Sequence, residues 1–324
     1  MSPPGDLRHS PPGAPAAPPR SRLRQLAKRG LFAASLPVAA IALGSLAAPW
    51  SWLGDLCLHL SWQASLALLP VLVVIGRERW RAGFLFLAML AGFWPSLIAA
   101  FETRAPTNTH ADAELRLATG NLYDFNDERP AALAAIRDLD VDLLALQEVL
   151  PPDEAVLHAR WPYVVWSNER GLLSSAFLSR HPITWSHIHD LYEFALIEAL
   201  VQTPKGMLRV FVVHLASPKQ PARAERRGQQ LRKLAELVHA SAEPVLIAGD
   251  FNLCTASSQW QGLVVDADVC RPAGPAPSTW PTWLGPLAID LDHVAGRGVA
   301  FAPLQSFLIP GSDHRGLITR LTLR

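Results

Sequence analysis

The chain has 324 residues, a length that allows about two domains, and its net charge of +1 conceals an uneven distribution. Residues 1–105 carry 10 Lys and Arg against 4 Asp and Glu, whereas residues 106–324 carry 19 against 24. The two parts have net charges of +6 and −5, which excludes one uniform domain. The negative carboxyl-terminal part also lacks the basic excess that is typical of nucleic-acid-binding domains.

Residues 1–30 are rich in Pro, Ala and Arg and offer few core residues, so we predict a disordered basic cytoplasmic tail. Three apolar stretches of 19 or 20 residues follow, each without Asp, Glu, Lys or Arg and long enough to cross a bilayer as a helix. They are Leu31–Pro49, Cys57–Ile75 and Ala82–Phe101. We therefore predict a membrane domain at residues 31–101 with three transmembrane helices. The alternative is a buried helical hairpin of a soluble protein, which three uncharged stretches disfavour.

Positive charge predicts the orientation of these helices. Basic residues precede the first stretch and also fill the loop between the second and third, whereas the loop Trp50–Leu56 has no Lys or Arg. Because positive loops stay in the cytoplasm, we expect a multi-pass protein of the cell membrane with everything after Phe101 extracytoplasmic. A signal-peptide cleavage site at Ser45–Ala48 is the alternative, but the long basic tail favours an uncleaved anchor. We expect His59 to have an interfacial position without a function.

After a polar linker at residues 102–114, strand and helix patterns alternate over residues 115–324. Apolar runs predict strands at Leu115–Thr119, Asp142–Leu146, Tyr163–Trp166, Ala176–Ser179, Leu196–Gln202, Leu208–Val213, Val245–Ala248, Ile289–Val294 and Leu317–Leu323. Helical patterns occupy Pro130–Leu139 and Ala222–His239. Hairpins mixed with helical crossovers predict two packed sheets with outer helices.

Polar residues stand where these strands end. Val245–Ala248 has the composition of a strand buried on both faces, and Asp250 and Asn252 follow it on one face of the extended chain. A carboxylate and an amide there suit a hard cation or a phosphate oxygen, with a simple Asx turn as the alternative. The other polar strand ends contribute Asn121, Glu148, His214, Asp290, Asp292, Asp313 and His314. So many polar strand ends in one domain indicate a shared site.

In order, type and spacing, these residues resemble the endonuclease/exonuclease/phosphatase superfamily of DNase I-like fold, over residues 115–324. The three apolar stretches resemble membrane-anchored bacterial members. The resemblance implies an α/β fold, a four-layer α/β sandwich, and phosphoester hydrolysis that depends on Mg²⁺ or Mn²⁺. The chemistry agrees, because an anionic phosphodiester repels hydroxide unless a hard cation withdraws charge.

The resemblance assigns three residues to the metal. Glu148 matches the main metal carboxylate, Asn121 a metal-side and phosphate-orienting amide, and Asp313 a second metal-side carboxylate. Glu148 follows Gln147, which we expect to have a structural or supporting role.

Five residues are assigned to the reacting phosphate. Asp250 matches the group that holds the attacking water, and Asn252 a phosphate-binding amide. His214 matches a phosphate-contacting histidine, and His314 a histidine on the scissile phosphate. Asp292 matches the carboxylate that orients His314 and favours its imidazolium form.

The strand Asp290–Val294 departs from the family pattern because it holds two aspartates. We favour Asp292, which directly precedes His293, but Asp290 remains an alternative. We expect His293 and Ser312 to serve structure or to support other site residues.

Three features outside these motifs stay open. The helix after His214 carries five basic residues, for which we favour a solvated face over a site for anionic headgroups. A loop with Trp280 and Trp283 either walls the pocket or is a packed turn. An oxidising compartment permits a disulfide between Cys254 and Cys270, against the alternative of two buried thiols. The five basic residues are Arg223, Arg226, Arg227, Arg232 and Lys233.

We predict a membrane-anchored, extracytoplasmic, metal-dependent phosphoesterase whose partners are the lipid bilayer and a phosphorylated substrate, with no obligate protein partner. A phosphatase acting on lipid-linked phosphate or pyrophosphate is the first hypothesis. An extracytoplasmic DNase-like endonuclease or exonuclease is the alternative. A catalytically silent phosphate- or lipid-binding module is the third, which the complete set of polar residues disfavours.

Overall fold

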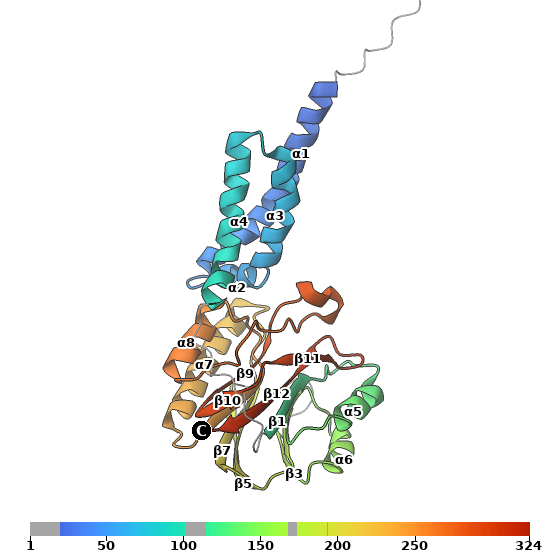
Figure 1. Cartoon of the computed structure of the whole chain (residues 1–324), viewed down its shortest axis with the longest axis vertical. Helices are drawn as coiled ribbons and strands as arrows, with labels where there is room; N and C mark the ends of the chain where they lie inside the picture. The colour runs from blue at the N-terminus through green and yellow to red at the C-terminus, as the bar shows by residue number, and fades with distance from the viewer. Residues whose placement is uncertain (1–19, 101–114, 168–173, 193) are drawn as a thin grey trace, which may run out of the picture.

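The computed structural model describes residues 20–100, 115–167, 174–192 and 194–324 (Figure 1). A bundle of helices, residues 20–100, stands on an α/β domain built from residues 115–324. The predicted linker at 102–114 and residues 1–19 of the predicted tail lie outside the described residues.

Two sheets form the inner layers of the α/β domain. The first has the order β10-β12-β1-β2-β4-β3, with β11 paired to β12, and the second the order β5-β6-β7-β8-β9. The strands of the first sheet are β1 (Leu115–Asn121), β2 (Leu143–Gln147), β3 (Tyr163–Trp166), β4 (Ser175–Ser179), β10 (Val299–Phe301), β11 (Gln305–Leu308) and β12 (Arg315–Leu323). Those of the second are β5 (Ile183–Leu191), β6 (Phe194–Thr203), β7 (Gly206–His214), β8 (Val245–Asp250) and β9 (Asp292–Arg297).

Helices cover both outer faces. Helices α5 (Arg129–Arg137) and α6 (Asp153–His158) pack on the first sheet, and α7 (Pro221–Ala240) and α8 (Ser258–Asp266) on the second. The predicted four-layer α/β sandwich is therefore confirmed. A short 3-10 helix, Thr282–Leu287, lies in the long connection between α8 and β9.

Alternation along the strands divides the core into three clusters. Leu246 of β8 points into the cluster between the sheets, together with Phe177 of β4. Its neighbour Ile247 points the other way and packs with Leu234 of α7. On the far side, Leu144 of β2 packs under α5 and α6. Strand β8 is thus buried on both faces, as its apolar run predicts.

Most predicted strands appear within a few residues of their expected bounds, and the hairpin at Pro204–Gly206 joins β6 to β7. Strand β9 begins later than predicted because Ile289 forms an isolated bridge with Trp280 before the ladder starts. Strand β5 was not predicted because it is a largely exposed edge strand without a clear apolar face. Strands β10 and β11 and helices α6 and α8 are short and were also missed.

The helical part consists of α1 (Arg20–Gly44), α2 (Trp52–His59), α3 (Ser61–Ile75) and α4 (Arg79–Ala100), with a 3-10 turn at Ser45–Ala47. Helices α1, α3 and α4 lie side by side around small and apolar residues such as Ala42, Leu68 and Ala88. Helix α1 begins at Arg20, so the prediction of a disordered tail is wrong for residues 20–30. Those residues are mostly good helix formers, and the proline-rich segment ends at Pro19.

Two helices, within Ser21–Ala47 and Arg79–Ala99, are long and apolar enough to span a membrane. The second predicted stretch is not one straight helix, because the chain bends by 63° between α2 and α3. Neither helix could span a membrane alone, but the bent pair could form one broken span. The segment Trp52–Leu56, predicted as a loop, forms most of α2. Ser51 caps this helix by accepting a hydrogen bond from the Gly54 backbone at 3.4 Å, which favours a new helix start there.

Candidate active site

The eight predicted site residues gather at one end of the space between the two sheets. The pairs β1/β2 and β7/β8 are parallel, so the carboxyl ends of each pair lie at one edge. Strands β9 and β12 run antiparallel to β8 and β1 and begin at that same edge. These strand directions bring the predicted site residues to one edge. They are Asn121, Glu148, His214, Asp250, Asn252, Asp292, Asp313 and His314.

Asp290 and Asp292 were both candidates for the carboxylate that orients His314, and the geometry favours Asp292. His314 Nδ1 lies 2.8 Å from Asp292 Oδ2, and both side chains are buried. Asp290 instead accepts hydrogen bonds from the Thr255 backbone at 3.0 Å and from its hydroxyl at 2.6 Å. Asp290 precedes β9 and stabilises the loop after β8, because the chain has not yet joined the ladder there.

Asp250 lies at the centre of the cluster. Its Oδ2 accepts a hydrogen bond from Asn121 Nδ2 at 3.1 Å and lies 3.8 Å from His314 Nε2 and 3.7 Å from His214 Nε2. Its Oδ1 accepts the Asn252 backbone N–H at 2.8 Å. Burial raises the pKa of Asp250 to about 6, although the two histidines act to lower it. Asp250 is therefore a carboxylate that can exchange a proton near neutral pH.

The two histidines are held in different protonation states. Burial acts to lower the pKa of His314, but the carboxylates of Asp292 and Asp250 outweigh it and raise that pKa to about 10. Burial is also the main cause at His214 and lowers its pKa, against the smaller opposing effect of Asp250. At neutral pH the site thus presents one imidazolium and one neutral imidazole.

The carboxylates of the site suit a divalent cation. Glu148 Oε1 accepts from Asn121 Nδ2 at 2.9 Å, and Oε2 accepts the Asp124 backbone N–H at 2.7 Å. Burial raises the pKa of Glu148, and the charge of nearby Asp313 adds to that shift. Four carboxylates face one imidazolium, so a hard cation with oxygen ligands would balance the excess of negative charge.

The described residues hold one group of three side chains that could bind such a cation. Ligand atoms of Asp250, Asp292 and His314 all lie within 4.8 Å of one another. A protonated imidazole has no lone pair for a metal, so the high pKa of His314 disfavours that set. The pair Glu148 and Asp313, which the resemblance assigns to the metal, stays a prediction, and Asn121 donates to Glu148 and Asp250 and holds them in place.

Supporting residues fix the loops that carry these side chains. Ser312 Oγ donates to the Asn121 carbonyl at 2.8 Å and accepts the His314 backbone N–H at 3.0 Å. Trp280 Nε1 donates to Asp313 Oδ2 at 2.8 Å. His293 turns away from the cluster, with Nε2 2.7 Å from the Leu253 carbonyl. Asn252 donates through Nδ2 to the Leu215 carbonyl at 2.9 Å.

A cavity of about 820 Å³ opens over this cluster, a volume suited to a small-molecule site. Trp280 lines this cavity, as predicted by the hypothesis that its loop walls the pocket. Trp283 does not line the cavity, and its side chain is 79% exposed. Sequence reasoning missed the aromatic wall formed by Tyr123, Phe125 and Phe194, because loop and edge aromatics have no distinctive pattern.

The helical part also lines this cavity. Leu56 and His59 of α2, followed by Leu60, reach the cavity that Asp250 and His314 line from the other side. Helix α2 lies at the end of the bundle that meets the α/β domain (Figure 1). The sequence predicted that His59 lies at the membrane interface without a function. The feature that could have indicated otherwise is Asp55, an ionisable residue directly before an apolar stretch.

Asp55 joins α2 to the α/β domain through Arg227 of α7. Arg227 Nη2 lies 2.5 Å from Asp55 Oδ2, and Arg227 is fully buried. Arg227 Nη1 also donates to the Asn252 carbonyl at 2.5 Å, and Trp52 Nε1 donates to the Pro218 carbonyl at 2.7 Å. The prediction of a solvated basic face on this helix is therefore wrong for Arg227, because α2 covers it.

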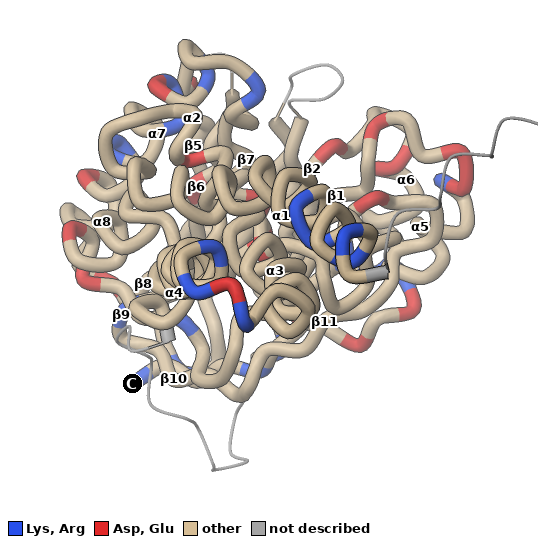
Figure 2. Tube along the Cα trace, turned by 90° about the horizontal axis from the view of Figure 1, so that it is seen from above, with Lys and Arg blue, Asp and Glu red and all other residues tan. Residues whose placement is uncertain are grey.

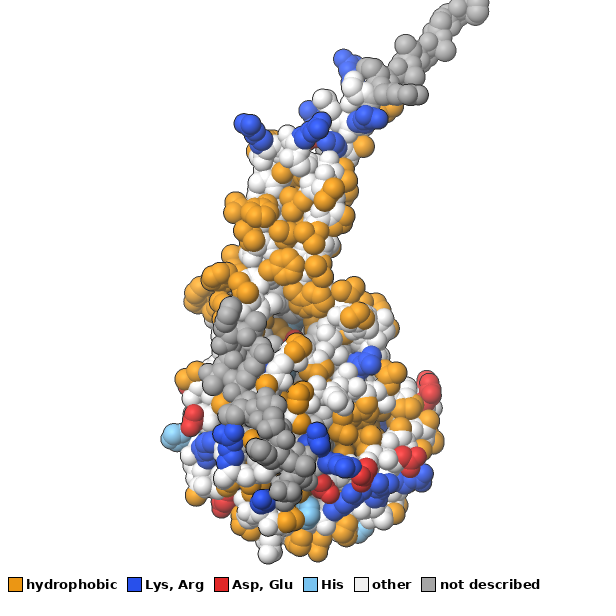
Figure 3. All heavy atoms as spheres, in the orientation of Figure 1, with side chains coloured by type: hydrophobic (Ala, Val, Ile, Leu, Met, Phe, Trp, Pro, Cys, Tyr) orange, Lys and Arg blue, Asp and Glu red, His pale blue; other side chains and the backbone are white. Residues whose placement is uncertain are grey.

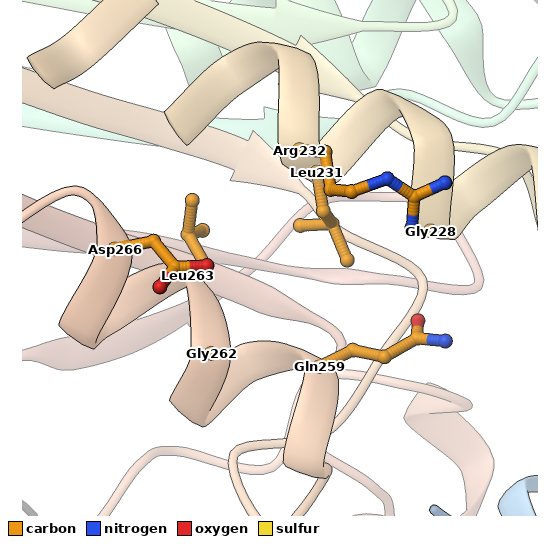
Figure 4. Close-up of a pocket in the computed structure, with 7 residues that line it drawn as sticks. All are labelled: Gly228, Leu231, Arg232, Gln259, Gly262, Leu263 and Asp266. Carbon is orange, nitrogen blue, oxygen red and sulfur yellow. The ribbon is translucent and has the colours of Figure 1, made fainter. Parts of the chain in front are cut away.

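A second, smaller cavity of about 160 Å³ lies between α7 and α8. Arg232 of α7 and Asp266 of α8 lie on opposite sides of it (Figure 4). The missing side chains of Gly228 and Gly262 leave this gap open. It holds none of the eight site residues. The three cysteines, all among the described residues, form no disulfide, so Cys254 and Cys270 are not joined.

Comparison with known proteins agrees with this geometry. The model of the Endonuclease/Exonuclease/phosphatase family matches residues 118–314. Comparison with curated protein sequences gives no match. Three similar solved structures share the fold at low sequence identity.

The first is D. rerio TDP2 complexed with single strand DNA product, at 19% identity and a TM-score of 0.56, covering 65% of this chain and 100% of that one. An endonuclease/exonuclease/phosphatase from Beutenbergia cavernae DSM 12333 is 20% identical, with a TM-score of 0.53 and coverages of 65% and 72%. One from Bacteroides vulgatus is 17% identical, with a TM-score of 0.53 and coverages of 65% and 99%. Because the family model spans more than half of the chain, the protein belongs to the endonuclease/exonuclease/phosphatase family.

Proposed function

We propose that the protein is a membrane-anchored, metal-dependent phosphatase that acts on a phosphate or pyrophosphate linked to a lipid. One observation carries this proposal: the cavity over Asp250 and His314 is also lined by Leu56 and Leu60 of the apolar helical part. A substrate that enters this cavity therefore meets the catalytic cluster and the anchor together. Family membership supports phosphoester hydrolysis as the reaction class.

The side chains of the cluster suit attack of water on a phosphorus atom. Ionised Asp250 orients the water and takes its proton, and Asn121 holds that carboxylate in position. Asp292 holds the imidazolium of His314 through Nδ1. Its Nε2–H is then free to donate a hydrogen bond to a phosphoryl oxygen, on which negative charge develops. A Mg²⁺ or Mn²⁺ ion held by Glu148 and Asp313 would withdraw charge from the phosphoryl group.

The distribution of charge supports a cytoplasmic amino terminus and an extracytoplasmic catalytic domain. Seen from above, Lys and Arg colour α1 and the start of α4 (Figure 2), and the side view shows them at the end of the bundle away from the α/β domain (Figure 3). Between that end and the domain, hydrophobic side chains cover the bundle (Figure 3), among them Val73 at 84% exposure and Leu87 at 63%. Because positive ends stay in the cytoplasm, this distribution supports a domain on the outer side.

A reporter enzyme fused after Arg324 tests this orientation. We expect activity from a reporter that works outside the cytoplasm, such as an alkaline phosphatase, and none from a cytoplasmic one. The reverse pattern would overturn the extracytoplasmic assignment and leave the hydrolase assignment intact.

A nuclease is the second candidate. The similar structure of D. rerio TDP2 is complexed with single strand DNA product, and Lys219 and Arg223 line the cavity here. Against it stand the net charge of −5 over residues 106–324 and the apolar wall given by α2. A silent binding module is disfavoured because all eight polar site residues are in place.

The deciding experiment measures phosphate release by the full chain in liposomes. The panel contains a long-chain lipid monophosphate, a lipid pyrophosphate, and single- and double-stranded DNA, each with Mg²⁺ and with EDTA. We expect release from a lipid substrate that EDTA and Glu148→Gln both abolish. Cleavage of DNA with no release from either lipid would overturn the proposal in favour of the nuclease.

A further inference from the structure

The bend between α2 and α3 is part of the cavity wall. We call residues 52–61 the elbow; of these, Leu56, His59 and Leu60 line the cavity. His59 ends α2 and Leu60 is the residue at which the helix direction changes, which turns these side chains toward the α/β domain. The elbow thus contributes residues to a site whose catalytic groups come from more than 60 residues further along the chain.

His59 is the unusual member of this wall. The residue is 7% exposed, and its Nε2 atom has no hydrogen-bond partner among the described residues. Buried polar atoms are almost always paired, so an unpaired imidazole nitrogen in a residue that lines the cavity indicates a partner that the described residues do not supply.

The elbow is held rigidly enough to act as a binding surface. The buried ion pair between Asp55 and Arg227 fixes one side of α2, and the hydrogen bond from Trp52 to the Pro218 carbonyl fixes its start. Gln63 Nε2 donates to the Leu287 carbonyl at 3.1 Å just beyond the bend. Pre-positioned groups of this kind lose little conformational entropy when they bind a ligand.

We propose that the elbow is the subsite for the lipid side of the substrate, an inference that rests on the proposed function. On binding, the His59 side chain turns so that its covered Nε2 atom hydrogen-bonds an oxygen of the group that links the scissile phosphate to the apolar chain. Leu56 and Leu60 contact the first carbons of that chain, which then continues along the apolar helices. The ligand class is an amphiphilic phosphoester with an oxygen-bearing group, such as a second phosphate, next to its chain.

The first test compares two substrates. For His59→Ala in the full chain, we measure kcat/KM on the lipid phosphoester and on a soluble aryl phosphoester without a chain. The ratio of the two values should fall about tenfold, the size expected for one lost hydrogen bond. His59→Gln, which keeps a hydrogen-bonding amide, should recover part of that ratio. Leu53→Ala, which changes an exposed residue of α2 outside the cavity lining, is the matched control and should keep the wild-type ratio.

A ratio that stays within about threefold of the wild-type value for His59→Ala, whether both activities fall or neither does, would overturn the elbow subsite. Failure of the proposed function has a different signature, namely hydrolysis of the aryl phosphoester by the wild-type chain with no hydrolysis of any lipid.

The second test needs no turnover. Full-length Asp250→Asn in liposomes is illuminated with a lipid phosphate analogue that carries a photoreactive group on its first carbons. We expect the labelled peptide to contain the elbow, and excess unlabelled lipid phosphate to suppress the labelling. Labelling confined to the outer faces of α1 and α4 would overturn the inference, because it is the pattern of a lipid that only dissolves in the bilayer.

Discussion

The cavity has two walls that are built differently. The strand-end wall takes its side chains from the ends of β1, β7 and β8, the start of β9 and the residues that follow β2 and precede β12. Hydrogen bonds join Asn121 to Glu148 and Asp250, and the Asp292 carboxylate lies 2.8 Å from His314 Nδ1. The elbow wall comes from one bent helix pair, held to the α/β domain chiefly by Asp55–Arg227 and by Trp52. This difference supports the proposal that the strand ends carry the chemistry and that the elbow selects which molecules reach it.

The largest effect should come from Glu148 in the strand-end wall. Glu148→Gln keeps the size of the side chain but removes the charge that a hard cation needs. We expect phosphate release to fall by orders of magnitude, to the level seen in EDTA, while the chain still folds. Circular dichroism and metal titration serve as the measurements. Turnover close to wild type at saturating Mg²⁺ would remove Glu148 from this role.

His314 should have the next largest effect. His314→Ala removes the imidazolium next to Asp250, and we expect a loss of roughly 10²–10⁴-fold in kcat. The wild-type pH profile should be a bell. Its acid limb lies near pH 6, where Asp250 becomes ionised, and its alkaline limb near pH 10, where His314 loses its proton. A bound cation stabilises ionised Asp250, so the acid limb should move to lower pH as Mg²⁺ rises.

The alkaline limb gives a finer test of the strand-end wall. Asp292→Asn removes the charge that raises the pKa of His314, so the limb should move to lower pH. Asp290→Asn is the matched control, since Asp290 bonds Thr255 and not His314. A shift of the limb by Asp290→Asn with none by Asp292→Asn would show that the hydrogen-bonded pair in solution differs from the one described here.

Loss of the ion pair that attaches the elbow to the α/β domain should lower the rate of hydrolysis less than the changes above, but it should clearly lower the stability of the protein. Asp55→Asn leaves Arg227 as a buried, unpaired cation, a change that typically costs about 3–5 kcal/mol. We expect a lower midpoint of thermal inactivation in detergent, and partial recovery when Arg227→Met is added. Lys233→Met, which breaks the exposed pair with Glu236, should change stability by less than about 1 kcal/mol. Equal effects of the two single variants would mean that the elbow is not held by this ion pair.

The strand-end wall could be predicted from the sequence because its signals are local. The apolar run Val245–Ala248 marks a strand buried on both faces. The extended chain expected through Asn252 is wrong, because the strand ends at Asp250 and Asn252 has a φ of 51°. Its backbone N–H donates to Asp250 Oδ1, which is the Asx turn given as the alternative. All eight predicted side chains meet at one end of the sandwich, because alternation and strand direction determine which face and which edge each residue occupies. The choice between Asp290 and Asp292 needed the structure, since it depends on where β9 joins its ladder.

The elbow depended on tertiary structure throughout. The sequence established that residues 31–101 are apolar and that basic residues flank them, because length and charge alone limit what a bilayer accepts. It did not establish the bend at Leu60, the burial of Arg227 or the place of His59. Each of these depends on a contact between residues far apart in the chain, such as Asp55 with Arg227, and no local pattern encodes such a pairing. The sequence thus determined which polar residues stand at the strand ends, and the family resemblance assigned their roles. Only the packing of the two parts brings the apolar helices to the cavity that these residues line, because it depends on contacts between residues far apart in the chain.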